Sequence, residues 1–258
     1  MNRITKLFKE KKSGILSVYF TAGYPALDDT CRTLAALQAK GIDMVEIGIP
    51  FSDPMADGPV IQQASNQALR NGMSLRLLFE QLKDMRQTIQ IPVILMGYLN
   101  PVMQYGFEAF CHSCVETGVD GVIIPDLPFA DYKADYKEVA EIHDLKMIML
   151  ISPETSDERI RLIDEHTSGF IYMVSSAATT GAQKRFSDTV KNYFQRVHAM
   201  NLKNPQLIGF GISNRATLQM ALEHASGAIV GSKFVELLEE NANPEDAVTG
   251  LLNVLEVV

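Results

Sequence analysis

The 258-residue sequence predicts an α/β fold, a (β/α)8 TIM barrel in which each of eight parallel strands is followed by a helix. Short aliphatic runs, typical of strands buried on both faces, recur along the chain and alternate with amphipathic stretches of helical period. Parallel strands need right-handed crossovers, and eight such units in about 250 residues fit a closed barrel better than an open doubly wound sheet.

The expected strands and helices follow from these runs and from their flanking residues. Apolar residues at helical spacing between positions 75 and 89 predict a helix, and Ser213 is expected to cap another helix over residues 214–224. Extra helices are expected at residues 3–12 and after the second and eighth strands, at 59–70 and 232–238. The eight strands are expected at residues 15–21, 44–49, 93–96, 121–124, 147–151, 170–174, 207–210 and 228–230. No linker-like tract divides the sequence, so we expect one domain over residues 1–258.

Composition excludes several classes of function. The net charge of −8 argues against nucleic acid or an anionic membrane as a partner, because both attract a clustered basic face. No apolar run approaches the roughly 20 residues of a membrane span, and no apolar signal segment follows Met1. Three cysteines without a secretory signal indicate a reducing compartment, so we expect a cytoplasmic protein.

The sequence offers little support for metal or nucleophile chemistry. Cys111 and Cys114 have the spacing of a redox or metal-binding pair, but with Phe107, Phe110 and Val115 they follow the rhythm of a buried helix stripe. The five histidines lie in or at the ends of helical stretches, and no second cysteine pair completes a site. We therefore expect no metal, and acid–base catalysis is the remaining option because the common nucleophile motifs are absent.

A carboxylate interrupts the second expected strand. Glu46 lies between Val45 and Ile47 and shares the opposite face with Met44. Burying an unpaired carboxylate costs free energy, so a functional role is the leading interpretation; a salt-bridged glutamate at a sheet edge or a strand end that reaches solvent is the alternative. Asp57 follows in a proline-rich loop, and reacting groups in such barrels come from the carboxyl ends of strands and the loops beyond them.

Glycine-containing turns follow the last three expected strands. They are Thr180-Gly181, Gly209-Phe210-Gly211 and Gly231-Ser232, and together they predict a phosphate site beside the helix that starts at Ser232. Each glycine alone is more often an ordinary turn residue. Phe210 is interpreted either as a cover for an apolar part of the ligand or as a core residue. Tyr172, on the same face as its apolar neighbours, is either a ligand contact or a core tyrosine.

The stretch from Glu46 to Pro59 resembles the signature of the tryptophan synthase alpha chain family. Further matching motifs extend the resemblance over essentially the whole chain, at residues 19–23, 96–101, 125–128, 180–181, 209–213 and 231–232. Two departures stand out: Ala178-Thr179 replaces the usual Gly-Val, and Tyr19 replaces a common Phe. Residues 175–184 are interpreted either as a lid over the substrate or as an ordinary surface loop.

The resemblance implies a TIM-barrel lyase of tryptophan biosynthesis that cleaves indole-3-glycerol phosphate into indole and glyceraldehyde 3-phosphate. It implies no cofactor in this chain, and a beta chain with pyridoxal phosphate as the partner in an alpha2beta2 tetramer. Glu46 is expected to donate a proton to indole C3 and Asp57 to accept a hydrogen bond from the indole N–H. Partner contacts are expected at Asp53, Pro54, Asn100, Pro101 and Pro128. The expected substrate-binding residues are Tyr19, Met96, Tyr98, Ile123, Tyr172, Thr180, Gly181, Phe210, Gly211, Gly231 and Ser232.

Three other functions remain open. A stand-alone lyase with the same chemistry would act without a beta chain. A different phosphate-binding barrel, such as a sugar-phosphate isomerase, would process substrates that lack an indole. A non-enzymatic subunit would only stimulate its partner, although such a scaffold need not retain a buried carboxylate.

Overall fold

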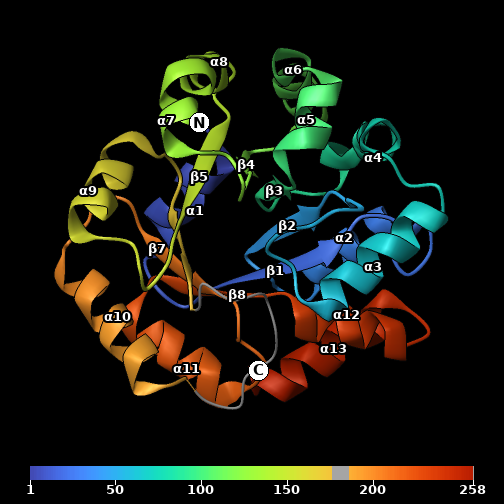
Figure 1. The fold of residues 1–258 in the computed structure, drawn as a ribbon. Coiled ribbons are helices and arrows are strands. Elements are labelled where there is room, and N and C mark those ends of the chain that lie inside the picture. Colours follow the sequence, from blue (N-terminus) through green and yellow to red (C-terminus); the bar gives the residue numbers. More distant parts are fainter. Residues whose placement is uncertain (176–185, 258) are drawn as a thin grey trace.

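A computed structural model describes residues 1–175 and 186–257, and its eight strands close into a barrel in chain order. All neighbouring strands are parallel, from the β1–β2 pair to the β8–β1 pair that closes the ring. Figure 1 looks along the barrel, with the helices arranged around the strands. The predicted TIM-barrel fold is therefore confirmed.

The strands lie where the apolar runs predicted them. Each predicted boundary differs from the observed one by at most one residue, which is the usual uncertainty of strand and helix ends. The observed strands are β1 Ile15–Thr21, β2 Met44–Gly48, β3 Val93–Met96, β4 Gly121–Ile123, β5 Lys146–Ile151, β6 Ile171–Val174, β7 Gln206–Gly209 and β8 Gly227–Val230.

The extra helices at the N-terminus and after β2 and β8 are present, as α1, α3 and α12. The α-helices are α1 Arg3–Glu10, α2 Asp29–Ala39, α3 Pro59–Arg70, α4 Leu75–Leu82, α5 Leu99–Tyr105, α6 Phe107–Thr117, α7 Phe129–Asp131, α8 Lys137–Ile142, α9 Asp157–His166, α10 Asp188–Ala199, α11 Arg215–His224, α12 Ser232–Glu240 and α13 Pro244–Leu255. Two short irregular helices complete the set, a 3-10 turn η1 at Met85–Gln87 and a π-helical segment η2 at Tyr132–Tyr136.

Four predicted helix details were wrong. The N-terminal helix ends at Glu10, two residues early, where the cap Lys11 is extended. The helix expected at residues 232–238 continues for two more residues, to Glu240. The helical spacing between 75 and 89 divides into α4 and the 3-10 turn η1. Asn214, not Ser213, caps α11, because the Asn214 side chain accepts a hydrogen bond from the Thr217 N–H at 3.0 Å.

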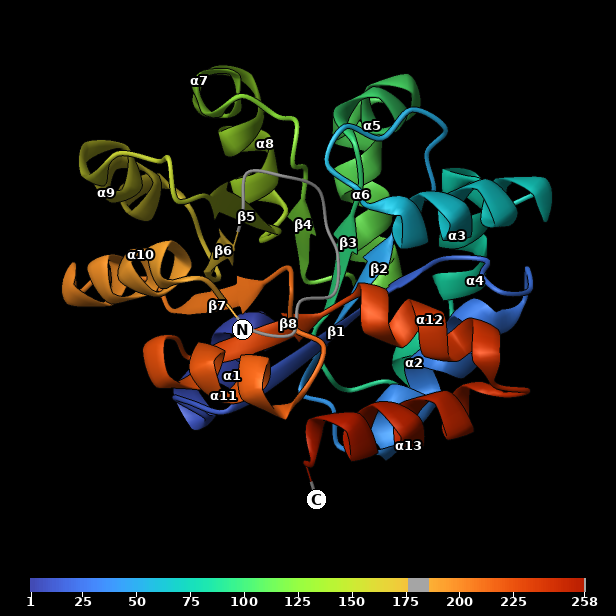
Figure 2. The ribbon, with the colours of Figure 1, turned by 60° about the horizontal axis from the view of Figure 1, so that its bottom comes forward.

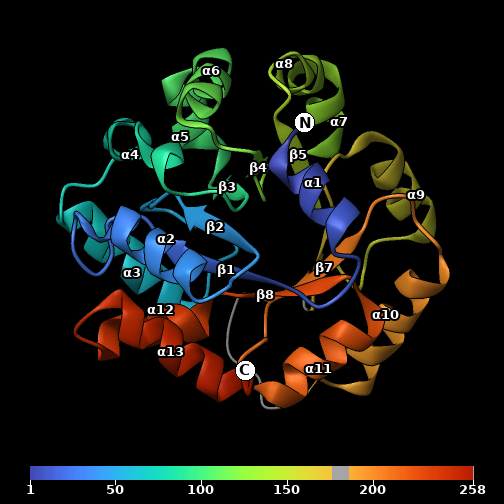
Figure 3. The same cartoon turned by 180° about the vertical axis from the view of Figure 1, so that it is seen from behind.

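The buried apolar residues form two layers, one inside the barrel and one between the strands and the helices. Met44 belongs to the inner layer, whereas Val45 and Ile47 belong to the outer one. This alternation confirms the face assignment of the second strand. Ile4 and Phe8 of α1 also join the inner layer, so α1 closes the amino end of the barrel, as Figure 3 shows from behind.

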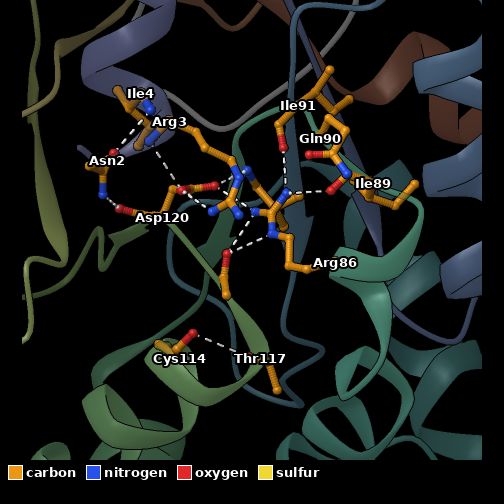
Figure 4. A network of polar contacts seen from close by, with 12 residues as sticks. Asn2, Arg3, Ile4, Arg86, Ile89, Gln90, Ile91, Cys114, Thr117 and Asp120 are labelled. Atoms are coloured by element: carbon orange, nitrogen blue, oxygen red, sulfur yellow. Dashed lines mark hydrogen bonds and ion pairs between the residues drawn. The ribbon is translucent and has the colours of Figure 1, made fainter.

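A buried carboxylate fastens α1 to this amino end (Figure 4). Asp120, only 3% exposed, accepts hydrogen bonds from the guanidinium groups of Arg3 at 3.1 Å and Arg86 at 2.6 Å. The backbone N–H of Val93 donates to the same carboxylate at 3.0 Å, and the Asn2 side chain donates to the Asp120 carbonyl at 2.8 Å. The network therefore joins α1, η1, β3 and β4.

The cysteine pair in α6 packs in the core as predicted. Cys111 and Cys114 are fully buried, whereas Val115, placed in the same stripe by its spacing, is 48% exposed, so its assignment was wrong. Val115 has the spacing of the stripe, but its side chain faces solvent. In the described part of the chain, no helix is long and apolar enough to cross a membrane.

Candidate active site

A cleft opens at the carboxyl ends of the strands, with about 460 Å³ of space between its walls, part of it open to solvent. Figure 2 turns the barrel so that α3 and α12, which are in contact, lie side by side. The cleft is lined by Tyr19, Asp57, Ile61, Met96, Tyr172, Phe210, Gly211, Ile212, Ile229, Gly231, Ser232 and Lys233. Its walls are thus largely apolar, with a few polar groups.

Glu46 is completely buried and only half paired. Its Oε1 accepts a hydrogen bond from the Ser17 hydroxyl at 2.9 Å, whereas Oε2 has no partner among the described residues. Burial raises the pKa of Glu46 to about 8, and the Ser17 hydrogen bond opposes this shift only in part. At neutral pH the side chain is therefore mainly a protonated acid, able to donate a proton.

Asp57 reaches the cleft from the loop after β2, and Tyr98 holds it there. The Tyr98 hydroxyl donates to Asp57 Oδ2 at 2.9 Å and accepts from the Ala56 N–H at 3.0 Å. The Phe51 ring lies 5.5 Å from the Tyr98 ring, which adds a second contact to the same loop. Burial raises the pKa of Asp57, and the Tyr98 hydrogen bond opposes that shift.

Two tyrosines are close enough to both carboxylates to feel their charge. Tyr19 pairs in register with Glu46 across the β1–β2 ladder, and Tyr172 lies on the inner face of β6. Burial is the main cause of the raised pKa of both phenols, and the charges of Glu46 and Asp57 add to it. Both hydroxyls therefore stay protonated over the physiological range and can act as hydrogen-bond donors.

Glycines make room for these tyrosines. A Cβ on Gly48 would lie 2.0 Å from the Tyr19 hydroxyl oxygen, and a Cβ on Gly209 would lie 2.2 Å from that of Tyr172. Any other residue at either position would displace a tyrosine. Gly209 thus serves close packing at the end of β7.

The cleft lining also includes backbone groups of the turns after β7 and β8. Gly211 has a φ of 79°, and Gly231 caps α12, whose N-terminus has no side-chain cap. An open helix N-terminus next to a cleft offers N–H donors and a partial positive charge to an anion. Phe210 lines the cleft and its ring centroid lies 6.0 Å from that of Tyr172, so its packing contact is observed and its contact with a ligand stays a prediction.

Comparison with known proteins identifies the family. A model described as the tryptophan synthase alpha chain matches residues 5–256. The chain belongs to this family. The tryptophan synthase alpha chain of Parabacteroides distasonis is 72% identical, with 99% of each chain covered. This membership confirms the predicted family and its lyase reaction in tryptophan biosynthesis, and it agrees with the expectation that pyridoxal phosphate belongs to the beta chain.

Solved structures agree with this assignment. Tryptophan synthase subunit alpha from Legionella pneumophila has a TM-score of 0.87 and 37% identity, covering 99% of this chain and 97% of that one. A chain in the tryptophan synthase complex from Pyrococcus furiosus has a TM-score of 0.85 and 33% identity, covering 95% of this chain and 99% of that one. The barrel is thus shared over nearly the full length.

The structure gathers most of the predicted substrate-binding residues at the cleft. Tyr98 does not line it and instead holds Asp57. Ile123 is fully buried in the inner layer and is not among the lining residues. Thr180 and Gly181 lie outside the described residues, as does nearly all of the loop interpreted as a lid. The residues at the cleft are Tyr19, Met96, Tyr172, Phe210, Gly211, Gly231 and Ser232.

Several residues at the site were not predicted. Ser17 holds Glu46, and Lys233 lines the cleft together with three isoleucines. Ser17 carried a signal, because it shares the inner face of its strand with Tyr19 and a small hydroxyl there needs a partner. Among the described residues, no group of three or more His, Cys, Asp or Glu side chains could hold a metal ion.

Proposed function

We propose that Glu46 and Asp57 are the two catalytic carboxylates of the family's lyase reaction in this chain. The observation that carries the proposal is the buried, half-paired Glu46, whose pKa is raised to about 8. A carboxylic acid with a pKa near the working pH is suited to donate a proton. Asp57, which lines the cleft, is suited to accept a hydrogen bond.

The proposed reaction is a retro-aldol cleavage of indole-3-glycerol phosphate. Glu46 donates its proton to indole C3, and the positive charge that develops on the ring is stabilised by a hydrogen bond from the indole N–H to Asp57. The bond between C3 and the glycerol carbon then breaks, and its electrons restore the indole ring. The neighbouring hydroxyl loses its proton to the Glu46 carboxylate and becomes the aldehyde of glyceraldehyde 3-phosphate, which regenerates the acid.

The two sides of the cleft match the two parts of this substrate. Gly231 and Ser232 form the N-terminus of α12, and Gly211 lines the same cleft. We assign these three residues to the phosphate. Tyr19, Met96, Tyr172 and Phe210 form apolar walls suited to the indole ring. Contacts of Ile123, Thr180 and Gly181 with the substrate stay predictions.

A beta chain is the proposed partner, in an alpha2beta2 tetramer. The Pyrococcus furiosus structure is described as a tryptophan synthase complex. The predicted contact residues follow three consecutive strands: Asp53 and Pro54 lie in the loop after β2, Asn100 and Pro101 in the first turn of α5, and Pro128 just before α7. Asp53, Asn100 and Pro128 are exposed, and Pro54 and Pro101 are half-buried. Met55, 78% exposed in the same loop as Asp53, adds an apolar contact. The single domain and the cytoplasmic location also stay predictions.

Because one loop carries both Asp53 and Asp57, binding of a beta chain there would order the catalytic carboxylate. The test is to incubate the purified chain with indole-3-glycerol phosphate, with and without a beta chain, and to measure indole. We expect indole in both samples and a faster rate with the partner. Equal rates would contradict the coupling and identify a stand-alone lyase, and no indole in either sample would refute the proposed reaction.

A further inference from the structure

A lysine lies beside the proposed phosphate site. Lys233 lines the cleft next to Ser232, and Asp57 is the other charged residue among the described lining residues. The Lys233 ammonium lies 3.2 Å from Glu236 Oε2, with the two side chains 23% and 33% exposed. The cleft lining therefore contains both a carboxylate, Asp57, and a cation, Lys233.

Helix stability does not account for this lysine. Lys233 is the second residue of α12, where the partial positive charge of the helix N-terminus disfavours a cation. The lysine also precedes its glutamate partner by three residues, and this order is less favourable than a glutamate that precedes a lysine. The position is thus electrostatically poor for a lysine unless an anion binds there.

Side-chain direction favours contact with such an anion. Side chains in an α-helix lean toward its N-terminus, so the Lys233 ammonium is within reach of the Gly231 end of α12 when it leaves Glu236. Gly231 and Gly211 line the same cleft. The protein carries a net charge of −8, which opposes the approach of a phosphorylated ligand, and a cation at the cleft offsets this repulsion locally.

We propose that Lys233 is a substrate-binding residue that donates a charge-assisted hydrogen bond to the phosphate group. Glu236 holds the ammonium in the structure, and the phosphate oxygens replace or share this partner when the ligand binds. The inference rests on the proposed phosphate site and adds a side-chain cation to its backbone donors.

The test compares four variants with the wild-type protein: Lys233→Gln, Glu236→Gln and Lys40→Gln, each of which replaces a charged side chain by a neutral one, and Lys233→Arg, which keeps the charge. Lys40 is exposed and follows α2, at the amino end of the barrel, so its variant controls for the loss of one positive charge. Binding of inorganic phosphate and of glycerol 3-phosphate is measured by calorimetry at low and high salt. Steady-state cleavage of indole-3-glycerol phosphate is measured in parallel.

We expect Lys233→Gln to weaken binding of both phosphate probes and to raise KM by about threefold to tenfold, with a smaller change in kcat. Its binding should also depend less on salt. Glu236→Gln should strengthen phosphate binding by releasing the ammonium, and Lys40→Gln should match the wild type. Lys233→Arg, which keeps the charge, should retain most of the affinity.

Unchanged phosphate affinity and KM in a folded Lys233→Gln protein would overturn the proposed role of Lys233, even if the wild type cleaves its substrate. Equal losses in Lys233→Gln and Lys233→Arg would also overturn it, because the charge would then not matter. Failure of the proposed function would give a different result. Wild-type protein that binds neither probe and releases no indole would refute the lyase site itself.

Discussion

Two buried carboxylates at opposite ends of the barrel differ in how completely they are paired. Asp120, at the amino end, accepts hydrogen bonds from two arginines and a backbone N–H, which engage both of its oxygens. Glu46, inside the barrel, has one hydrogen bond, from Ser17, and an Oε2 without a partner in the described structure. Full pairing ties Asp120 to the elements around it, whereas the incomplete pairing of Glu46 leaves one oxygen available for proton exchange.

The difference matches the division of labour in barrels of this kind. Residues at the amino end of the strands contribute to stability, and residues at the carboxyl end carry the chemistry. Asp120 links α1 to the amino end of the barrel (Figure 4), and the described partner of Glu46 is the Ser17 hydroxyl of the neighbouring strand β1. The comparison therefore predicts that an amide substitution mainly lowers turnover at Glu46 and mainly lowers stability at Asp120.

The largest expected effect is on turnover in Glu46→Gln. The amide cannot donate a proton to indole C3, so kcat should fall by about 10²–10⁴-fold, the usual contribution of a general acid. Indole release is the measurement. Glu240→Gln, the same change at an exposed position of α12, is the control and should leave the rate unaltered. Near-normal turnover in Glu46→Gln would remove Glu46 from the mechanism.

The second effect is on stability in Asp120→Asn. The amide leaves the buried guanidinium of Arg86 without its charged partner, so the free energy of unfolding should fall by about 3 kcal/mol. Urea denaturation measures this loss. Below the unfolding transition, kcat should stay close to that of the wild type. A stable but inactive Asp120→Asn protein would break the proposed division between the two ends.

The third prediction concerns pH. Burial raises the pKa of Glu46 from 4.5 in its reference state to about 8 in the fold, so the folded protein holds a proton there that the unfolded chain releases. This contribution to stability is fully present below pH 4.5 and is lost as the pH rises toward 8. Between pH 6 and 8, wild-type stability should fall by about 2 kcal/mol more than that of Glu46→Gln. Parallel denaturation curves at each pH would contradict the raised pKa.

The sequence predicted the barrel well because its strands are buried on both faces. Continuous apolar runs such as 93–96 have one plausible reading, and their ends were located to within a residue. Helix ends were predicted less accurately because neighbouring residues of similar type can each take the capping position. Ser213 and Asn214 are both good N-cap types, and only the geometry of Thr217 decides between them.

At the site, the sequence located residues better than their contacts. Glu46 was recognisable because a carboxylate in an apolar strand is unusual. The partner of Asp57 was not, because Tyr98 lies 41 residues further along the chain, and only the closed barrel brings them together. Asp120 gave no signal either, since its arginine partners are distant in sequence. Lys233 was missed because a lysine near a helix start resembles an ordinary surface residue.

The smallest predicted effect tests a carboxylate with intermediate pairing. Asp57 receives one side-chain hydrogen bond, from Tyr98, whose hydroxyl also accepts from Ala56. Tyr98→Phe should loosen the loop and lower kcat by about tenfold, the cost of a lost hydrogen bond to a charged group. Tyr105→Phe, which removes a hydroxyl bonded to Ser113 at the other end of α5, is the matched control. If a beta chain orders the same loop, its addition should restore part of the lost rate in Tyr98→Phe. An equal loss in both variants would mean that the Tyr98 hydroxyl acts through α5 and not through Asp57.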